Sequence, residues 1–234
     1  LLRWTPPTLG QISPNRFIPV AEASGAITPI GAWVLEEACR SAARWRRHEP
    51  DGPRLRMAVN VSGRQLADPE LVDTVVGVLE RTGWPAADLV LEVTETSLVE
   101  DVERAAERLT ALHDLGVQLA IDDFGTGYSS LTYLRLFPVD ILKVDRSFID
   151  AITERGRTPA IVRGLLDLGR TLGLETVAEG IEHLHQLDLL REEGCDQGQG
   201  YLFAHPLSAE DAEALVARGD SPPGPAATDV TAAR

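Results

Sequence analysis

Residues 117–128 read Val-Gln-Leu-Ala-Ile-Asp-Asp-Phe-Gly-Thr-Gly-Tyr. The stretch begins as a short apolar run with β-branched residues, which predicts a buried strand. The run ends in two adjacent carboxylates, and two glycines follow that allow the backbone to turn tightly or to approach a ligand. Two like charges at the end of a buried strand are costly unless a cation lies between them.

The pair Asp122-Asp123 has two interpretations. Neighbouring side chains of a regular strand point to opposite faces, so both carboxylates reach one metal site only if the strand ends at this pair. The alternative is a turn in which an aspartate caps a helix over Ser129–Arg135. The rest of the chain has to decide between them.

Composition limits the classes of function. The chain has 234 residues, 44% of them hydrophobic, which suffices for one large domain or two small ones with a sizeable core. The net charge of -14 argues against a basic face that binds duplex nucleic acid. A small anionic ligand remains possible if metal ions reverse the local field.

The two cysteines and the apolar runs indicate the compartment. Cys39 and Cys195 lie far apart without metal-ligand spacing, which fits a reducing compartment and a fold without disulfides. No signal peptide and no apolar run of transmembrane length is visible. We expect a cytoplasmic location, either free or as the cytoplasmic part of a membrane-anchored protein.

The two ends of the chain are expected to differ. Proline and glycine predict an irregular loop over Leu1–Pro19, and a helix over Pro29–Arg47 follows with its periodicity set by Trp33, Val34, Ala38 and Ala42. Residues 49–53 predict a turn. The tail, residues 218–234, is rich in Pro, Gly and Ala and is expected to be disordered.

Strand and helix patterns alternate between these ends. Strands are expected at Leu55–Val61, Asp88–Val93 continuing through Thr94-Glu95-Thr96, Val117–Asp123, Val139–Val144 and Glu175–Ala178. Helices are expected at Pro69–Thr82, Glu100–Leu115, Ser129–Arg135, Pro159–Leu172, His183–Glu193 and Ala209–Ala217. This alternation predicts an α/β fold with a parallel sheet, and the number of units favours a closed (β/α) barrel. An open doubly wound sheet is the second choice, but no Gly-rich phosphate loop follows the first strand.

Polar residues stand where these strands run out. Such positions meet on one rim of a barrel, and here they are Asn60, Glu92, Asp122, Asp123, Lys143 and Glu179. The amide and the four carboxylates are hard oxygen ligands, which select two Mg²⁺ or Mn²⁺ ions with Asp122 as the bridge. Such a site can activate a water for attack on a phosphodiester, and Lys143 could orient that water or take its proton. Solvated caps and a surface lysine are the alternative for each residue taken singly.

The histidines lack such placement. His113, His183, His185 and His205 are interpreted as surface or helix residues.

Eight ordered motifs resemble the EAL domain family. They are Leu-Leu-Arg-Trp (1–4), Phe-Ile-Pro-Val-Ala-Glu (17–22), Asn-Val-Ser (60–62), Glu-Val-Thr-Glu (92–95), Asp-Asp-Phe-Gly-Thr-Gly-Tyr-Ser-Ser-Leu (122–131), Leu-Lys-Val-Asp-Arg-Ser-Phe-Ile (142–149), Ala-Glu-Gly-Ile-Glu (178–182) and Gly-Gln-Gly-Tyr-Leu-Phe (198–203). The resemblance covers residues 1–217 as one domain. It implies a modified TIM (β/α)8 barrel that hydrolyses cyclic di-GMP to linear pGpG with Mg²⁺ or Mn²⁺.

The resemblance also implies a role for each site residue. Asn60, Glu92 and Asp122 resemble ligands of a first metal, and Asp122 and Asp123 resemble ligands of a second metal with Glu179 beside them. Lys143 resembles the lysine that holds the catalytic water, and Glu95 the glutamate that anchors the loop after Asp123. Gln199 and Glu182 resemble further polar residues of the pocket, and Arg3 the arginine that contacts a substrate phosphate.

One departure concerns the start of the chain. Leu1 corresponds to the Leu of the Glu-Ala-Leu motif, so the Glu of the motif, a metal ligand, and most of the first barrel strand would precede it. The activity of the chain without that Glu stays open. The resemblance further implies a homodimer and upstream GGDEF, PAS or other sensory domains.

Three functions compete at this point. The first is a cyclic di-GMP phosphodiesterase domain, and the second is a degenerate module that binds cyclic di-GMP or a protein without turnover. The third is an unrelated metal-dependent barrel enzyme, such as a carboxylate-rich lyase. Degenerate members of the family typically have replaced metal ligands or lysine, and this chain retains all of those matched.

Overall fold

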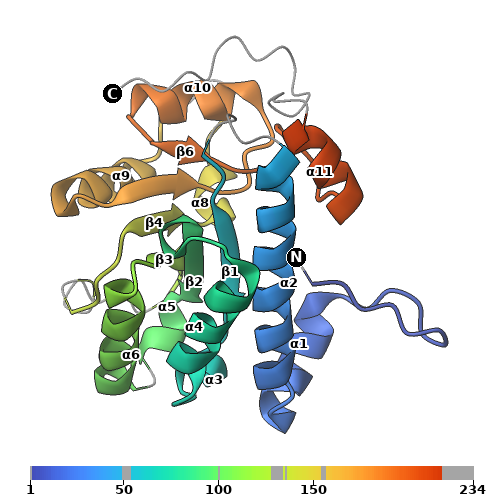
Figure 1. The fold of residues 1–234 in the computed structure, drawn as a ribbon. Helices are drawn as coiled ribbons and strands as arrows, with labels where there is room; N and C mark the ends of the chain where they lie inside the picture. The colour runs from blue at the N-terminus through green and yellow to red at the C-terminus, as the bar shows by residue number, and fades with distance from the viewer. Residues whose placement is uncertain are drawn as a thin grey trace. The chain divides into compact units, whose positions relative to one another are not determined.

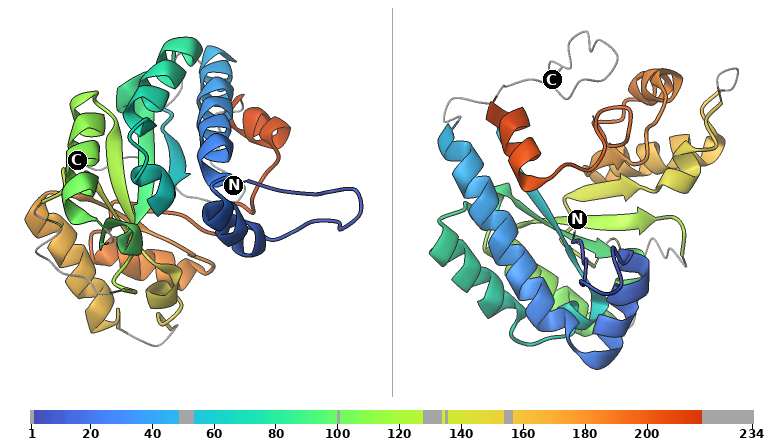
Figure 2. Two further views of the ribbon diagram at one scale, coloured as in Figure 1. Left: turned by 90° about the horizontal axis from the view of Figure 1, so that it is seen from below. Right: turned by 90° about the vertical axis from the view of Figure 1, so that its right-hand side faces the viewer.

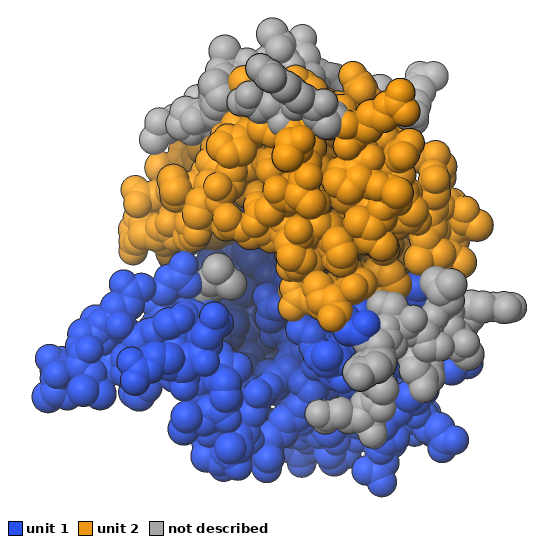
Figure 3. All heavy atoms as spheres, turned by 180° about the vertical axis from the view of Figure 1, so that it is seen from behind, with its two compact units in different colours: residues 1–44, 54–121, 127–139 blue, residues 45–53, 122–126, 140–234 orange. Residues whose placement is uncertain are grey.

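The chain forms two compact units in the computed structural model, which describes residues 2–48, 54–99, 101–127, 134, 136–153 and 157–217. Unit 1 comprises residues 1–44, 54–121 and 127–139, and unit 2 comprises residues 45–53, 122–126 and 140–234 (Figure 3). Each unit is described by itself below.

The strands of the described residues follow one another in sheet order as they do in sequence. They are β1 (Met57–Val61), β2 (Leu89–Thr94), β3 (Gln118–Phe124), β4 (Ile141–Val144), β5 (Glu175–Ala178) and β6 (Gln197–Gly198) (Figure 1). The pairs β1/β2, β4/β5 and β5/β6 are parallel. The predicted α/β class with a parallel sheet is therefore confirmed.

Unit 1 combines β1, β2 and the first part of β3 with amphipathic helices. Its elements are α1 (Pro14–Ser24), most of α2 (Ile27–His48), α3 (Gly63–Leu66), α4 (Leu71–Thr82), η1 (Ala86–Asp88), α5 (Glu95–Val99) and α6 (Val102–Asp114). Helices α4 and α6 lie side by side (Figures 1 and 2). They bury apolar residues at helical spacing, such as Val75 and Val78 on α4 and Leu109 and Leu112 on α6. These rows cover a sheet whose strand β2 is buried over residues 89–93.

Unit 2 is built in the same way. It contains the end of β3, strands β4 to β6 and helices α8 (Arg146–Ile149), α9 (Ala160–Leu172), α10 (Leu184–Glu192) and α11 (Ala209–Ala217). Helix α9 packs on β4 and β5. A Cβ on Gly169 of α9 would lie 2.4 Å from Cγ2 of Thr176 on β5. Only glycine allows the helix to come this close to the strand.

Helix α2 confirms the predicted helix, but only part of the residues that predicted it are buried. Its buried residues include Ile27, Leu35, Cys39 and Ala42, whereas Trp33 is 58% exposed. Of the four residues that predicted this helix, Ala42 lies on the buried side and Trp33 does not. The physical reason is that small residues such as Ala fill either face equally well, so they do not orient a helix.

The N-terminal loop prediction was partly wrong. Residues 14–24 form α1, although Pro14 and Pro19 both lie within it. Pro14 stands in the first turn, where a missing N–H costs nothing and the fixed φ suits a helix. Phe17 and Ala21 are buried one turn apart, and this burial outweighs the backbone hydrogen bond that Pro19 cannot donate.

The predicted extension of β2 holds for Thr94 but was wrong for residues 95 and 96. Helix α5 begins at Glu95, directly after the last strand residue Thr94. The Thr94 hydroxyl lies 2.7 Å from the Ser97 hydroxyl and 3.2 Å from that of Thr96, so it ends the strand by supporting the first helical turn.

Helix α8 was not anticipated. It is only four residues long, and its N-terminal cap is Asp145, whose carboxylate accepts from the backbone N–H of Ser147 at 3.0 Å.

Three predicted features lie outside the described residues. They are the turn at residues 49–53, all but one residue of the helix over Ser129–Arg135, and the disordered tail from residue 218. Within the described part of the chain, no helix combines the length and the apolarity that crossing a membrane requires.

Candidate metal and catalytic site

Lys143 lies in a buried ion-pair cluster in unit 2. It comes from β4, is 4% exposed, and is the only lysine in the sequence. Its Nζ lies 3.0 Å from Oδ1 of Asp122 and 2.6 Å from Oε1 of Glu179. A buried ammonium costs several kcal/mol unless such partners compensate it, so the two carboxylates account for a charged lysine in this position.

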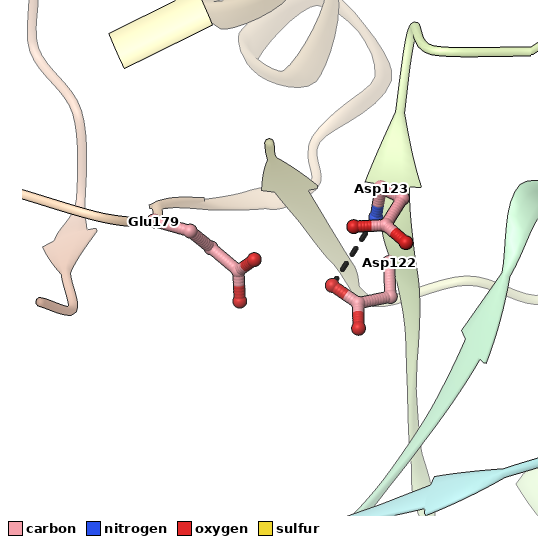
Figure 4. A group of neighbouring side chains, drawn as sticks. All are labelled: Asp122, Asp123 and Glu179. Atoms are coloured by element: carbon pink, nitrogen blue, oxygen red, sulfur yellow. Dashed lines mark hydrogen bonds between the residues drawn. The ribbon is translucent and has the colours of Figure 1, made fainter. Parts of the chain in front are cut away.

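Three carboxylates of unit 2 gather beside this lysine. Oxygens of Asp122, Asp123 and Glu179 all lie within 4.8 Å of one another (Figure 4). Carboxylate oxygens at this spacing are the donor set that Mg²⁺ and Mn²⁺ prefer. The three carboxylates therefore fit a divalent cation. Two of them, Asp122 and Glu179, also contact Lys143.

Backbone geometry at Asp123 brings the two aspartates together. Strand β3 was predicted to end at the pair Asp122-Asp123, but it continues through Phe124. Instead, Asp123 has φ 55, which is the left-handed region that few residues other than Gly, Asn and Asp adopt. The backbone N–H of Asp123 donates to Oδ1 of Asp122 at 3.1 Å (Figure 4), and the Thr126 hydroxyl donates to the Asp123 carbonyl at 2.8 Å. One left-handed residue thus replaces the predicted strand end.

The charges around Asp123 affect its protonation. Burial raises the pKa of its carboxyl, and the negative charges of Asp122 and Asp145 raise it further against the opposing effect of Lys143. For Asp145, burial acts to raise the pKa, but hydrogen bonds from Ser147 outweigh it and leave the pKa lowered. The site is therefore rich in negative charge that a divalent cation would neutralise.

Asp145 is a member of this group that the sequence analysis missed. It stands two residues after Lys143, at the end of β4, and the period-2 alternation of a strand was the signal that could have found it.

Asn60 and Glu92 form a pair in unit 1. They are partners in the parallel register of β1 and β2, and the Asn60 side-chain amide donates to Oε2 of Glu92 at 3.1 Å. Glu92 is buried and Asn60 is exposed. The strand register alone therefore brings these two predicted ligands together. Asn60 lies one position before the end of β1, and Glu92 lies two positions before the end of β2.

Glu95 is a buried carboxylate of unit 1 next to the segment that follows Asp123. It opens α5 and is 7% exposed. A Cβ built on Gly127 would lie 3.1 Å from its Oε1, so the Glu95 carboxylate packs directly on that glycine backbone. The role of Glu95 as the anchor of the loop after Asp123 stays a prediction.

Gln199 and Glu182 belong to unit 2, and both are tied to the residues after β5. The N–H of Gln199 donates to the Ala178 carbonyl at 2.8 Å, and its carbonyl accepts from the Ile181 N–H at 3.0 Å. Glu182 forms an ion pair with Arg146 at 2.8 Å. No pattern in the sequence had singled out Arg146 as a partner of Glu182.

Arg3 and the histidines complete the set of sequence predictions. Arg3 is an exposed residue of unit 1, and its guanidinium donates to the carbonyl of the adjacent Leu2 at 3.2 Å. His113, His183 and His205 are exposed, as predicted. His185 is half-buried, and its Nε2 lies 3.3 Å from the Ile152 carbonyl oxygen.

Comparison with known proteins identifies the family. The sequence profile described as "EAL domain" matches residues 1–206. The chain belongs to the EAL domain family. This EAL chain is 47% identical over 207 residues to the cyclic di-GMP phosphodiesterase NbdA of Pseudomonas aeruginosa, covering 88% of this chain and 26% of NbdA. It is 44% identical over 219 residues to the bifunctional diguanylate cyclase/cyclic di-GMP phosphodiesterase MucR of the same organism, covering 93% of this chain and 31% of MucR.

A solved EAL structure shows the same fold. The cyclic di-GMP complex of the PaMucR phosphodiesterase superposes with a TM-score of 0.84 at 43% identity, covering 91% of this chain and 85% of that one. The expected TIM-barrel-like fold of an EAL domain is thereby confirmed. The chain spans about a quarter to a third of the length of most of the curated relatives it matches.

Proposed function

We propose that this chain is a phosphodiesterase domain that hydrolyses cyclic di-GMP to linear pGpG. The observation that carries the proposal is Lys143, buried between Asp122 and Glu179 beside a three-carboxylate cluster, in a chain of the EAL family. NbdA and MucR, which are 47% and 44% identical to it, are named as cyclic di-GMP phosphodiesterases.

Hydrolysis needs a nucleophilic water, a stabilised phosphorane-like charge and a protonated leaving group. Water attacks one phosphorus, the P–O3′ bond breaks, and the released 3′ oxygen takes a proton, so one ring opening consumes one water. Divalent cations bound at the site would supply charge neutralisation and a more acidic water. EAL-type phosphodiesterases are metal-dependent, and the acidic cluster of unit 2 offers suitable ligands.

The residues of this chain would divide the work as follows. We assign Asn60, Glu92 and Asp122 to one Mg²⁺ or Mn²⁺ ion and Asp122 and Asp123 to a second, as the family resemblance implies, with Glu179 beside them. Lys143 would hold the attacking water by donating to it, since its position is fixed by Asp122 and Glu179. Arg3, Glu182 and Gln199 are proposed substrate contacts, and Glu95 is proposed as the anchor of the loop that follows Asp123.

The test is a direct assay of the purified protein. Incubation with cyclic di-GMP and Mg²⁺ or Mn²⁺ should release pGpG, and a chelator should stop the release. Replacing these ions by Ca²⁺, a hard cation that permits binding, should retain the nucleotide without turnover. If the protein binds cyclic di-GMP but releases no pGpG with either catalytic ion, it is a binding module and the proposed activity is wrong.

Other properties of the whole protein stay predictions. They are the homodimer, the upstream GGDEF or sensory domains and the cytoplasmic location that the family resemblance and composition imply. Size-exclusion chromatography with light scattering tests the homodimer, and the sequence of the gene tests for GGDEF or sensory domains.

A further inference from the structure

Gln186 makes three hydrogen bonds from a buried position in unit 2. It lies in the first turn of α10 and is 3% exposed. Its Oε1 accepts from the backbone N–H groups of Glu182 at 2.9 Å and His183 at 3.0 Å. Its Nε2 donates to the carbonyl of Ile149 at 3.1 Å, which is the last residue of α8. A single side chain therefore ties the segment after β5 to the end of α8.

The two segments joined in this way follow the strands that carry the lysine cluster. Strands β4 and β5 pair in register with Val144 opposite Ala178. Helix α8 begins two residues after β4, which carries Lys143, and Glu179 directly follows β5. The three hydrogen bonds of the Gln186 side chain end on Glu182, His183 and Ile149. They therefore act on the segments that follow Glu179 and Lys143, whose contact is 2.6 Å long.

Arg146 adds a second tie between the same segments. Gly180 has φ 73, and a Cβ there would lie 2.4 Å from Cγ of Arg146, so the arginine stem packs on the glycine. Its guanidinium lies 2.8 Å from Oε1 of Glu182. This ion pair is half exposed, and such pairs contribute little. The buried amide of Gln186 is the stronger of the two ties because its loss would leave two backbone N–H groups without their acceptor.

We propose that Gln186 is a positioning residue for the phosphodiesterase reaction. By holding the segment 179–183 against α8, it keeps the Glu179 carboxylate at contact distance from Lys143 and within the carboxylate cluster. The inference rests on the proposed function. It extends that function to a residue whose side-chain hydrogen bonds end on Glu182, His183 and Ile149.

Two substitutions separate the parts of this tie. Gln186→Leu keeps the size of the side chain and removes all three hydrogen bonds. Gln186→Glu retains an acceptor for Glu182 and His183 but has no N–H to donate to Ile149, so it breaks only the link to α8. Groups that orient metal ligands typically change activity or metal affinity about 10- to 100-fold when removed. We expect kcat and Mn²⁺ affinity to fall within that range for Gln186→Leu and by less for Gln186→Glu, with little change in KM.

A matched control distinguishes positioning from general loss of stability. Leu190→Ala lies on the same helix, removes a side chain that is 1% exposed and leaves the three Gln186 hydrogen bonds in place. It should lower the melting temperature yet keep kcat and Mn²⁺ affinity within about twofold when assayed well below that temperature. Amide hydrogen exchange of the peptide 179–183 should accelerate most in Gln186→Leu, less in Gln186→Glu and not in Leu190→Ala.

The measurements also separate this inference from the proposed function. If the unchanged protein releases no pGpG, the proposed function fails. The Mn²⁺ affinity and the hydrogen exchange of the Gln186 variants, compared with the unchanged protein, still test whether Gln186 positions the segment 179–183. If Gln186→Glu and Gln186→Leu keep the kcat and the Mn²⁺ affinity of the unchanged protein, Gln186 only caps α10 and the inference is wrong. A Gln186→Leu protein that fails to fold leaves Gln186→Glu to decide.

Discussion

Two groups of strand-end polar residues follow different rules. In unit 1, Asn60 and Glu92 meet because β1 and β2 pair in register, and a neutral amide donates to one carboxylate. In unit 2, three carboxylates and Lys143 meet. Asp123 contributes through its left-handed backbone, and Glu179 contributes from just beyond the end of β5. In this chain, regular strand pairing places the ligand pair of unit 1, and irregular backbone contributes to the charged cluster of unit 2.

The difference has an energetic origin. The unit 1 pair sets one carboxylate against a neutral donor, so the contact between Asn60 and Glu92 carries no like-charge repulsion. Three carboxylates in close contact repel one another, and the buried ammonium of Lys143 offsets only part of that repulsion. The unit 2 cluster is therefore the part of the molecule whose stability and function should respond most to a divalent cation.

The largest expected effect comes from Asp122→Ala. It removes a carboxylate that contacts Lys143 and belongs to the metal-ligand cluster, while the unit 1 pair remains intact. Release of pGpG should fall below detection, and calorimetric titration should show weaker Mn²⁺ binding with a lower stoichiometry. The control Asp167→Ala removes an exposed carboxylate from α9 and should change neither. Unchanged metal stoichiometry in Asp122→Ala would contradict its assignment as a bridging ligand.

Lys143→Ala should have the next largest effect. Positioned groups that handle protons contribute about 10²- to 10⁴-fold, and kcat should fall in that range while nucleotide binding persists. A variant with raised KM and normal kcat would show that the lysine only holds the substrate.

The single lysine also permits a chemical test of the cluster. Amine-reactive reagents can label only Lys143 and the N-terminal amine, so labelling of Lys143 reports on its burial. Labelling should be slow in the folded protein and faster in Glu179→Gln, which replaces one charged partner by a neutral one. Equal rates in the two proteins would argue against a buried ion-pair cluster.

Glu95→Ala should have an intermediate effect because it acts through the segment that it packs on. Loss of its contact with Gly127 should reduce activity or metal affinity about 10- to 100-fold. The control Glu103→Ala removes an exposed glutamate from the first turn of α6 and should retain full activity. Full activity and unchanged Mn²⁺ affinity in Glu95→Ala would refute the anchoring role.

The smallest expected effect is a difference in stability between glycine and alanine variants at Asp123 in unit 2 and at Asn60 in unit 1. At Asp123, φ 55 disfavours alanine, so Asp123→Gly should be more stable than Asp123→Ala by about 1 kcal/mol. At Asn60, in the regular strand β1, Asn60→Gly should be less stable than Asn60→Ala by about 0.5–1 kcal/mol. Urea unfolding of the four variants measures both differences, and the same sign in both regions would remove the contrast between them.

Much of the fold could be predicted from local pattern. The bounds of β5 and α11 agree with the prediction, and the helix over Pro159–Leu172 differs from α9 by one residue. These elements have clear periodicity and clear breakers at their ends. The predictions failed where one residue served two purposes, as at Thr94, which ends β2 and supports the first turn of α5. Pro19 misled for a related reason, because burial of Phe17 and Ala21 outweighed the missing hydrogen bond.

The candidate site divides in the same way between sequence and structure. The sequence by itself determined the ligand types, the α/β class and the placement of each polar residue near a strand end, because composition and period-2 alternation are local properties. Only the tertiary structure decided which of these residues touch. The arrangement of the two aspartates depends on one backbone angle, the left-handed φ of Asp123. The contact of Lys143 with Glu179 and the hydrogen bond from Gln186 to Ile149 join residues that are distant in sequence. No periodicity encodes such contacts, since their energy comes from burial and charge that exist only once the strands have paired.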